Sequence, residues 1–332
     1  MGILDAPSYS RAQTDAKIAG ADATPRSTTS VLGCLGDSLT AGNQDSTGVT
    51  YPQQLTLGLP DVTVVNLGVA GATATEVAIR AGAVDLTLGA FTLPADTSSV
   101  SVVPTISTTD WHAGQTYTGV LTVGGATYAG TLTETSPGGS ATWTFARSSA
   151  GSSVNVPAGA VFHCTAYDAY IDKFTLIEVG RNSIIFGDQA KITPMVQAIV
   201  NRLSPTLKRY LVLAVPTRTA EGSGSTNYTK VAAANADLAA TFGDRFVDWR
   251  RYVIDNGLSV NGLTASSDDT TAIAADTIPP SLSYDGLHPN QFGYRAMAIS
   301  VLNAITSRGW SSGRVKSIPS VKGSIITSDA FT

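Results

Sequence analysis

The sequence predicts an α/β fold in which helices cover both faces of a parallel sheet, with an all-β module inserted into it. Two observations predict the sheet: short apolar runs recur along the chain, and segments with helical spacing of apolar residues lie between them. Strands that alternate with helices favour parallel pairing, because a crossover between parallel strands needs a connection about as long as a helix. A third observation, a central stretch rich in Thr, Ser, Gly and Val, predicts the module.

The composition is that of a folded chain. Of 332 residues, 43% are hydrophobic and 14% are charged, which gives enough apolar surface for a core and too little charge for disorder. The net charge is −4 and no Lys/Arg run occurs, so we expect no nucleic-acid partner. No segment approaches the roughly 18 apolar residues that span a bilayer, and no signal-peptide pattern begins the chain.

The expected strands are continuous apolar runs, as in strands that are buried on both faces. We place them at residues 31–35, 62–67, 174–179 and 210–215, with a weaker candidate at 245–249. Between them, apolar residues recur at about i, i+3 and i+4, which is typical of helices with one buried face. We place the helices at residues 51–59, 75–83, 188–203, 227–242 and 291–305.

The inserted module is expected over residues 91–168. Thr118–Val123 and Thr142–Phe145 alternate polar and apolar residues, and Gly-Gly and Pro-Gly turns separate such stretches, as in a β-sandwich. A module can be accommodated where both of its ends meet a surface loop. The expected organisation is an N-terminal arm or linker (1–29), a discontinuous α/β domain (30–90 and 169–310), the β-sandwich (91–168) and a C-terminal tail (311–332).

Four aromatic residues of the module have two interpretations. Trp111, Tyr117, Tyr128 and Trp143 could form a surface on which sugars stack, which would make the module carbohydrate-binding. Aromatic residues of a sandwich more often fill its core, and we favour that interpretation.

Cysteines and potential metal ligands are sparse. Cys34 and Cys164 are the only two cysteines, and we expect them to be buried hydrophobic side chains rather than a disulfide framework. His163, Cys164 and Asp168 stand close together, but three mixed residues without a second cluster fall short of a metal site. We therefore expect no metal and no cofactor.

Reactive side chains follow the expected strands. In an open parallel sheet, ligands bind beyond the carboxyl ends of the strands. Ser38, Gly71 and Asn182 follow the first three strands, and His288 lies in the loop before the last helix. A hydroxyl nucleophile, an imidazole and amide donors are the groups that acyl transfer requires. Asp285, three residues before His288, can turn back and accept its ring N–H, which completes a catalytic triad.

Four segments, in order, resemble the blocks of the GDSL, or SGNH, hydrolases. They are Gly36-Asp37-Ser38-Leu39, Asn66 to Gly71, Gly180-Arg181-Asn182 and Asp285 to His288. The resemblance covers roughly residues 31–90 and 169–306. It implies a three-layer α/β/α fold resembling flavodoxin, and hydrolysis of carboxylic esters. It also implies an oxyanion hole to which Gly71 lends its backbone N–H and Asn182 its side-chain amide, beside the backbone N–H of Ser38. One departure is Ser183, where many members have Asp.

Two other segments have patterns that bear on the reaction. Gly309–Gly313 fits the Gly-x-Ser-x-Gly elbow of α/β-hydrolases by letter, but no strand precedes it, no helix follows and no histidine lies downstream. It is interpreted as a surface loop. The long Thr/Ala-rich stretch Thr264–Pro280 is either a flexible flap over the site or an inert loop.

The expected function is that of a serine esterase or deacylase that forms an acyl-serine intermediate. Its expected substrates are acetyl or short acyl groups on a cell-surface glycan. Alternatives are a lipid-ester hydrolase, or a glycan-binding, adhesive virion module on an incidental hydrolase scaffold. In addition, Tyr9–Ala16 resembles segments of bacteriophage tail proteins, and Ser328–Thr332 resembles the start of a further module. This resemblance implies an extracellular, virion-associated location, with phage-tail or homo-oligomer partners.

Overall fold

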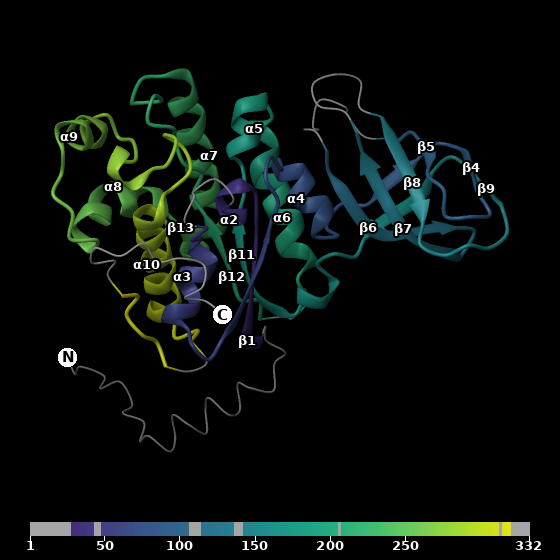
Figure 1. The fold of residues 1–332 in the computed structure, drawn as a ribbon, viewed down its shortest axis with the longest axis horizontal. Helices are drawn as coiled ribbons and strands as arrows, with labels where there is room; N and C mark the ends of the chain where they lie inside the picture. The colour runs from purple at the N-terminus through teal and green to yellow at the C-terminus, as the bar shows by residue number, and fades with distance from the viewer. Residues whose placement is uncertain are drawn as a thin grey trace, which may run out of the picture.

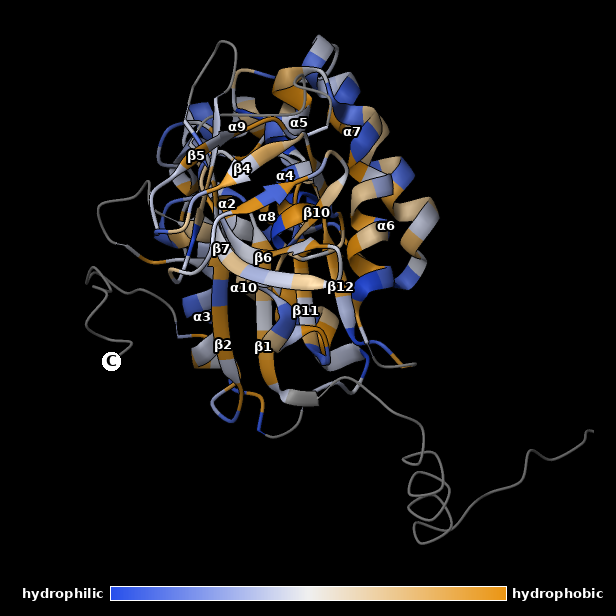
Figure 2. Ribbon diagram, turned by 90° about the vertical axis from the view of Figure 1, so that its right-hand side faces the viewer, coloured by the Kyte–Doolittle hydropathy of each residue, from blue (hydrophilic) through white to orange (hydrophobic). Residues whose placement is uncertain are grey.

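The computed structural model describes residues 28–42, 48–105, 114–135, 142–204, 207–311 and 314–319. Its central element is a five-stranded sheet with the order β13-β12-β11-β1-β2, in which every pair of neighbours is parallel. The strands are β1 (Thr28–Gly36), β2 (Thr63–Gly68), β11 (Lys173–Glu178), β12 (Tyr210–Leu213) and β13 (Phe246–Val247). Each overlaps one predicted strand, and apolar residues run along the sheet (Figure 2). The strand predicted at 62–67 is not buried on both faces, because β2 lies at the edge of the sheet and all of its residues are partly buried or exposed.

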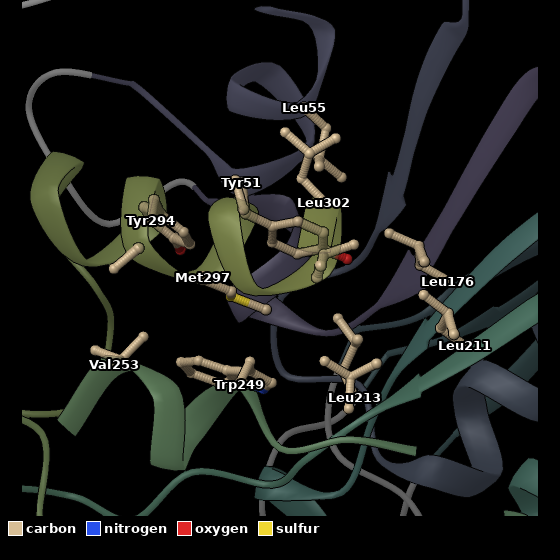
Figure 3. Close-up of a cluster of buried hydrophobic side chains, with 14 of the residues drawn as sticks. Tyr51, Leu55, Leu176, Leu211, Leu213, Trp249, Val253, Tyr294, Met297 and Leu302 are labelled. Atoms are coloured by element: carbon tan, nitrogen blue, oxygen red, sulfur yellow. The ribbon is translucent and has the colours of Figure 1, made fainter. Parts of the chain in front are cut away.

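Helices cover both faces of this sheet, which confirms the predicted α/β/α layers (Figure 1). One face carries α3 (Tyr51–Gly58), α8 (Trp249–Val260) and α10 (Gln291–Ser307). The other carries α4 (Ala74–Arg80), α6 (Ile192–Arg202) and α7 (Thr226–Phe242). Alternate residues of one strand serve the two cores, as Leu176 and Ile177 of β11 do. On the α10 side, Trp249, Val253 and Met297 close the core over the strand side chains (Figure 3).

The strand predicted at 245–249 is shorter than expected, and four helices were missed. β13 holds only Phe246 and Val247, because Asp248 caps α8 by accepting a hydrogen bond from the backbone N of Arg251. The missed helices are α2 (Ser38–Ala41), α5 (Arg181–Phe186), α8 and α9 (Ser267–Ala274). The helix predicted over 188–203 begins with a 3₁₀ turn, η3 (Gln189–Lys191), before α6.

The stretch Thr264–Pro280, expected to be a flexible flap or an inert loop, is partly helical. It contains α9, which begins with a capping box between Ser266 and Asp269. After the helix, the Asp276 carboxylate accepts hydrogen bonds from Arg250 and Arg251 of α8. These polar contacts order a segment that has little apolar surface to bury.

The central part of the chain forms antiparallel strands, as its composition predicted. They are β3 (Leu86–Leu88), β4 (Phe91–Leu93), β5 (Val100–Val102), β6 (Thr116–Val123), β7 (Ala126–Glu134), β8 (Trp143–Arg147), β9 (Val154–Val156) and β10 (Ala160–Cys164). Six make a sheet with the order β3-β10-β6-β7-β8-β5, and β4 pairs with β9. The first strand starts before the predicted boundary at residue 91, since Leu86–Leu88 pairs with β10. The status of this region as a separate domain stays a prediction.

The aromatic residues of these strands lie mainly in a core. Tyr117 and Trp143 are buried, with stacked rings whose centroids are 6.2 Å apart. The Tyr128 ring is half-buried under the guanidinium of Arg147, and Trp111 lies outside the described residues. The core interpretation therefore holds for Tyr117 and Trp143, and nothing in their packing offers a surface for a sugar.

The two cysteines and the candidate metal ligand His163 lie in the described part of the chain. Both cysteines are buried and unpaired, as predicted. His163 contacts Asp85 and Asp168 through its two ring nitrogens, at 2.6 and 3.5 Å. The part of Gly309–Gly313 that the structure describes follows helix α10 rather than a strand. Tyr9–Ala16 and Ser328–Thr332 lie outside the described residues. Over the described ranges, no helix is both long and apolar enough to cross a bilayer.

We predict that Gly68→Ala destabilises the fold at the end of β2. An added Cβ would overlap the backbone N of Ala41 and the side chain of Thr40, so the chain after Ser38 would have to move. Overpacking of this kind costs about 1–3 kcal/mol, which a urea unfolding curve would resolve. Gly89→Ala is the control, because its added Cβ would come no closer than 3.4 Å to a neighbour. Equal stabilities of the two variants would contradict the prediction.

Candidate active site

The register of the sheet brings three predicted residues to one edge. Gly36 of β1 lies opposite Gly68 of β2 and Glu178 of β11, so these strands end side by side. Ser38 follows β1 directly as the first residue of the short helix α2 (Ser38–Ala41). Gly71 follows β2 and Asn182 follows β11 within a few residues. The edge is the carboxyl end of the sheet, where ligands of open α/β folds bind.

His288 reaches this edge from the loop before α10 and contacts both predicted partners. Its Nε2 lies 2.9 Å from the Ser38 Oγ, and its Nδ1 lies 2.8 Å from the Asp285 Oδ2. Both distances are those of hydrogen bonds. A hydroxyl, an imidazole and a carboxylate therefore form a continuous chain, with Ser38 and His288 250 positions apart in the sequence. The geometry is that of a nucleophile, a base and the group that orients the base.

The loop around Asp285 is held by its own hydrogen bonds. The Asp285 Oδ1 accepts from the backbone N of Leu287 and of His288, at 3.0 and 2.8 Å. The Ser283 hydroxyl accepts from the Gly286 N and donates to the His288 carbonyl. Partial burial opposes ionisation of Asp285, but the hydrogen bonds from His288 and Leu287 outweigh it and lower the pKa of the carboxyl. Asp285 is thus an anion at neutral pH beside the ring that it orients.

Candidate oxyanion donors surround the hydroxyl. Gly71 has φ of +79°, and an added Cβ would meet nothing within 4 Å, so its backbone conformation rather than crowding calls for glycine. Among the described residues, the backbone N–H groups of Ser38 and Gly71 have no hydrogen-bond acceptor. The Asn182 amide donates to the carbonyl of Ala72 at 2.9 Å and lies 3.4 Å from Asp37 Oδ2. The short bond to Ala72 ties Asn182 to the Gly71 turn.

Two buried carboxyl groups lie beneath Ser38. Asp37 is inaccessible and caps α2 by accepting from the Leu39 N at 2.9 Å. Glu178 is equally buried and accepts from the Thr40 hydroxyl at 3.1 Å. Burial raises the pKa of Asp37 to about 6, and burial together with the Asp37 charge raises the pKa of Glu178. A charge on either carboxyl group disfavours ionisation of the other.

Sequence reasoning missed the role of Glu178, for which the only signal was its place at the end of an apolar run. It also missed a buried ion pair next to Asn182. Arg181 donates from two guanidinium nitrogens to Glu221, each at 2.7 Å. Ser183, the departure from the resemblance noted above, accepts a hydrogen bond from the backbone N of Ala74 at 3.0 Å. The serine therefore still supplies an acceptor at the start of α4.

Comparison with protein families agrees with the four sequence segments. The model of the GDSL-like lipase/acylhydrolase family matches residues 32–301. A protein from Desulfitobacterium hafniense DCB-2, described as lipolytic and of the G-D-S-L family, is 12% identical with a TM-score of 0.44, over 83% of this chain and 99% of that chain. A member of the lipolytic G-D-S-L family from Veillonella parvula DSM 2008 is 13% identical with a TM-score of 0.44, over 83% of this chain and 98% of that chain.

An acylhydrolase structure from Bacteroides fragilis NCTC 9343 is 13% identical with a TM-score of 0.42, over 91% of this chain and 99% of that chain. A comparison with curated proteins finds none that matches. The family match spans most of the chain and includes all four motif segments. The chain therefore belongs to the GDSL-like lipase/acylhydrolase family and is an ester hydrolase.

Proposed function

We propose that the chain is a serine esterase in which Ser38 is the nucleophile, His288 the general base and Asp285 the residue that orients it. The observation that carries this proposal is the position of the His288 ring between the Ser38 Oγ, at 2.9 Å, and the Asp285 Oδ2, at 2.8 Å. As the Ser38 Oγ attacks the ester carbonyl carbon, its proton passes to the His288 Nε2. The Asp285 carboxylate stabilises the imidazolium that results.

The negative charge then develops on the former carbonyl oxygen. The backbone N–H groups of Ser38 and Gly71 support this step, because neither has an acceptor among the described residues. The Asn182 amide is the third donor: one of its two hydrogens stays on Ala72, and the other leaves the 3.4 Å contact with Asp37 Oδ2 for the oxyanion. Donors that the fold holds in place stabilise the tetrahedral intermediate with little reorganisation during the reaction.

Collapse of the intermediate breaks the bond to the alcohol, which leaves with the proton from His288. An acyl-serine remains on Ser38. Water then attacks the acyl carbon while His288 removes its proton, and the second tetrahedral intermediate collapses to the carboxylic acid. The same proton returns to the Ser38 Oγ, so the enzyme is restored without a cofactor in the cycle.

The proposed substrate is an acetyl or short acyl group on a cell-surface glycan. In support of a substrate whose alcohol part stays in solvent, the site reaches the surface: the side chains of His288 and Asp285 keep 11% and 33% of their surface exposed. A second candidate, a lipid ester, is favoured by apolar side chains that stay exposed beside the site. Ile185 and Phe186 end the helix that begins at Arg181, and Tyr284 precedes Asp285.

We predict that Ser38→Ala and His288→Ala each lower kcat on an activated acetyl ester such as 4-nitrophenyl acetate by more than about 10⁴-fold. The native chain should show a burst of nitrophenol equal to the enzyme concentration where deacylation is the slower step. Stopped-flow absorbance measures both. Ser259→Ala, an exposed serine of α8, is the matched control and should turn over normally. Normal activity of Ser38→Ala would refute the assignment of the nucleophile.

We predict that Asn182→Ala lowers kcat by about 10²- to 10³-fold with little change in KM, because its contact with the substrate oxygen strengthens in the transition state. Steady-state kinetics on the same ester measures the two constants. Asn201→Ala, on the exposed end of α6, serves as control. A rise in KM with unchanged kcat would remove Asn182 from the oxyanion hole.

We predict that a panel of acetylated glycans and acyl esters, analysed by mass spectrometry, releases acetate most rapidly, and that Ser38→Ala releases none. The paired variant Ile185→Ser/Tyr284→Ser should then retain its activity on acetylated glycans. Preferential release of long-chain fatty acids, lost in the paired variant, would instead support the lipid-ester alternative.

A further inference from the structure

A buried ion pair stands directly beside the proposed oxyanion amide. Arg181 immediately precedes Asn182 and is 2% exposed, which is rare for an arginine. Its Nη1 and Nη2 donate to the two carboxylate oxygens of Glu221, each at 2.7 Å. This bidentate arrangement fixes the orientation of both groups as well as their separation. Arg181 is therefore held in one position, and with it the start of α5.

Glu221 is fixed just as firmly on its own side. Its Oε2 also accepts from the backbone N of Arg218 at 3.0 Å, and its Oε1 accepts from the Asn227 side chain at 2.8 Å. Partial burial opposes ionisation, but the hydrogen bonds from Arg181, Arg218 and Asn227 lower the pKa of Glu221 to about 2. The carboxylate thus belongs to a closed turn at residues 218–221 and not to a free loop.

The same turn contacts the catalytic loop. Thr219 donates to the carbonyl of Gly286 from its backbone N at 2.7 Å and from its hydroxyl at 3.1 Å. Gly286 lies between Asp285 and His288 and has φ of +84°. One four-residue turn therefore touches, on one side, the residue before Asn182 and, on the other, the loop that carries the acid and the base.

Stability alone does not explain this ion pair. Replacement of a buried ion pair by apolar residues of similar volume is often neutral or stabilising, because desolvation of the two charges offsets their attraction. What apolar residues cannot supply is a fixed direction. An oxyanion donor needs one, since a displacement of about 1 Å near the reacting atoms can cost on the order of 100-fold in rate.

We propose that Arg181 and Glu221 are positioning residues that keep the Asn182 amide in a fixed position relative to His288. Thr219 connects this ion pair to the loop that carries Asp285 and His288. This inference rests on the proposed function, in which Asn182 donates to the oxyanion. Neither Arg181 nor Glu221 acts on the substrate. Their effect on turnover passes through Asn182.

The test is a double-mutant cycle between Glu221→Gln and Asn182→Ala on an activated acetyl ester. Glu221→Gln alone should lower kcat by about 10- to 100-fold with little change in KM. In the Asn182→Ala background the same substitution should have no further effect on kcat, because the donor that it positions is already gone. A purely structural role would give losses that multiply. Multiplying losses, or wild-type kcat in Glu221→Gln, would overturn the proposal.

Because Glu221→Gln leaves a buried guanidinium without its counter-charge, it risks failing to fold. Arg181→Lys is the second variant: it keeps the charge but loses the bidentate geometry, and the same cycle applies to it. Arg295→Lys is the control for loss of a buried arginine elsewhere. Arg295 bonds the carbonyls of Val260, Ile318 and Pro319, so its variant should lower the melting temperature without the kcat loss.

Thr219→Val tests the other end of the turn, since it removes only the hydroxyl bond to Gly286. A kcat loss below about tenfold is expected, in line with one neutral hydrogen bond, and wild-type kcat would remove Thr219 from the proposal. Ser38→Ala, measured in parallel, distinguishes failure of the positioning role from failure of the proposed function. If Ser38→Ala is inactive and Glu221→Gln is normal, only the positioning role fails. If Ser38→Ala is active, the proposed function itself fails.

Discussion

The site depends on the close approach of β1 to its two parallel neighbours at their carboxyl ends. Gly36 and Gly68 lie opposite each other, and an added Cβ on either would overlap the residues of α2. Without side chains at these positions, the chain after β1 can turn sharply, so that Ser38 begins a helix at once. The turn places the hydroxyl at the rim, next to the strands that lead to Gly71 and Asn182. Strand register, rather than any single contact at the site, thus determines which residues can meet.

Asp37 and Glu221, two carboxyl groups near that turn, have pKa values shifted in opposite directions. Burial raises the pKa of Asp37, so the folded state gains stability from its protonated form below pH 4 and loses it as the pH rises through about 6. Glu221 is ion-paired and its pKa is lowered, so its contribution is present above about pH 4.5 and is lost as the pH falls towards 2. At neutral pH the site therefore keeps a costly anion under Ser38.

The sequence was sufficient for the sheet and for the residues that follow its strands, because both depend on local patterns. Continuous apolar runs identified the strands, and Ser38 and His288 were found because they are reactive types at strand and helix ends. The missed helices lack such a pattern. α8 buries Arg250 and Gly257 at core positions, α9 buries Asp269, and α5 leaves Ile185 and Phe186 exposed while it buries Arg181. From the sequence alone, a buried polar side chain that bonds to a distant partner cannot be distinguished from a polar side chain that faces solvent.

Glu221 shows the same limit at the level of the site. It stands in a segment rich in Gly, Ser and Thr, which is typical of a surface loop, and its partner Arg181 is 40 positions away. No spacing rule connects two such residues, because their meeting requires β11 and β12 to be paired first. Once these strands are adjacent, the loops that follow them are neighbours, and a charged residue of one loop can hold the other loop in place. Candidate reactive residues can thus be proposed from their type and place in the chain, whereas residues that hold them become visible only when the strands are assembled.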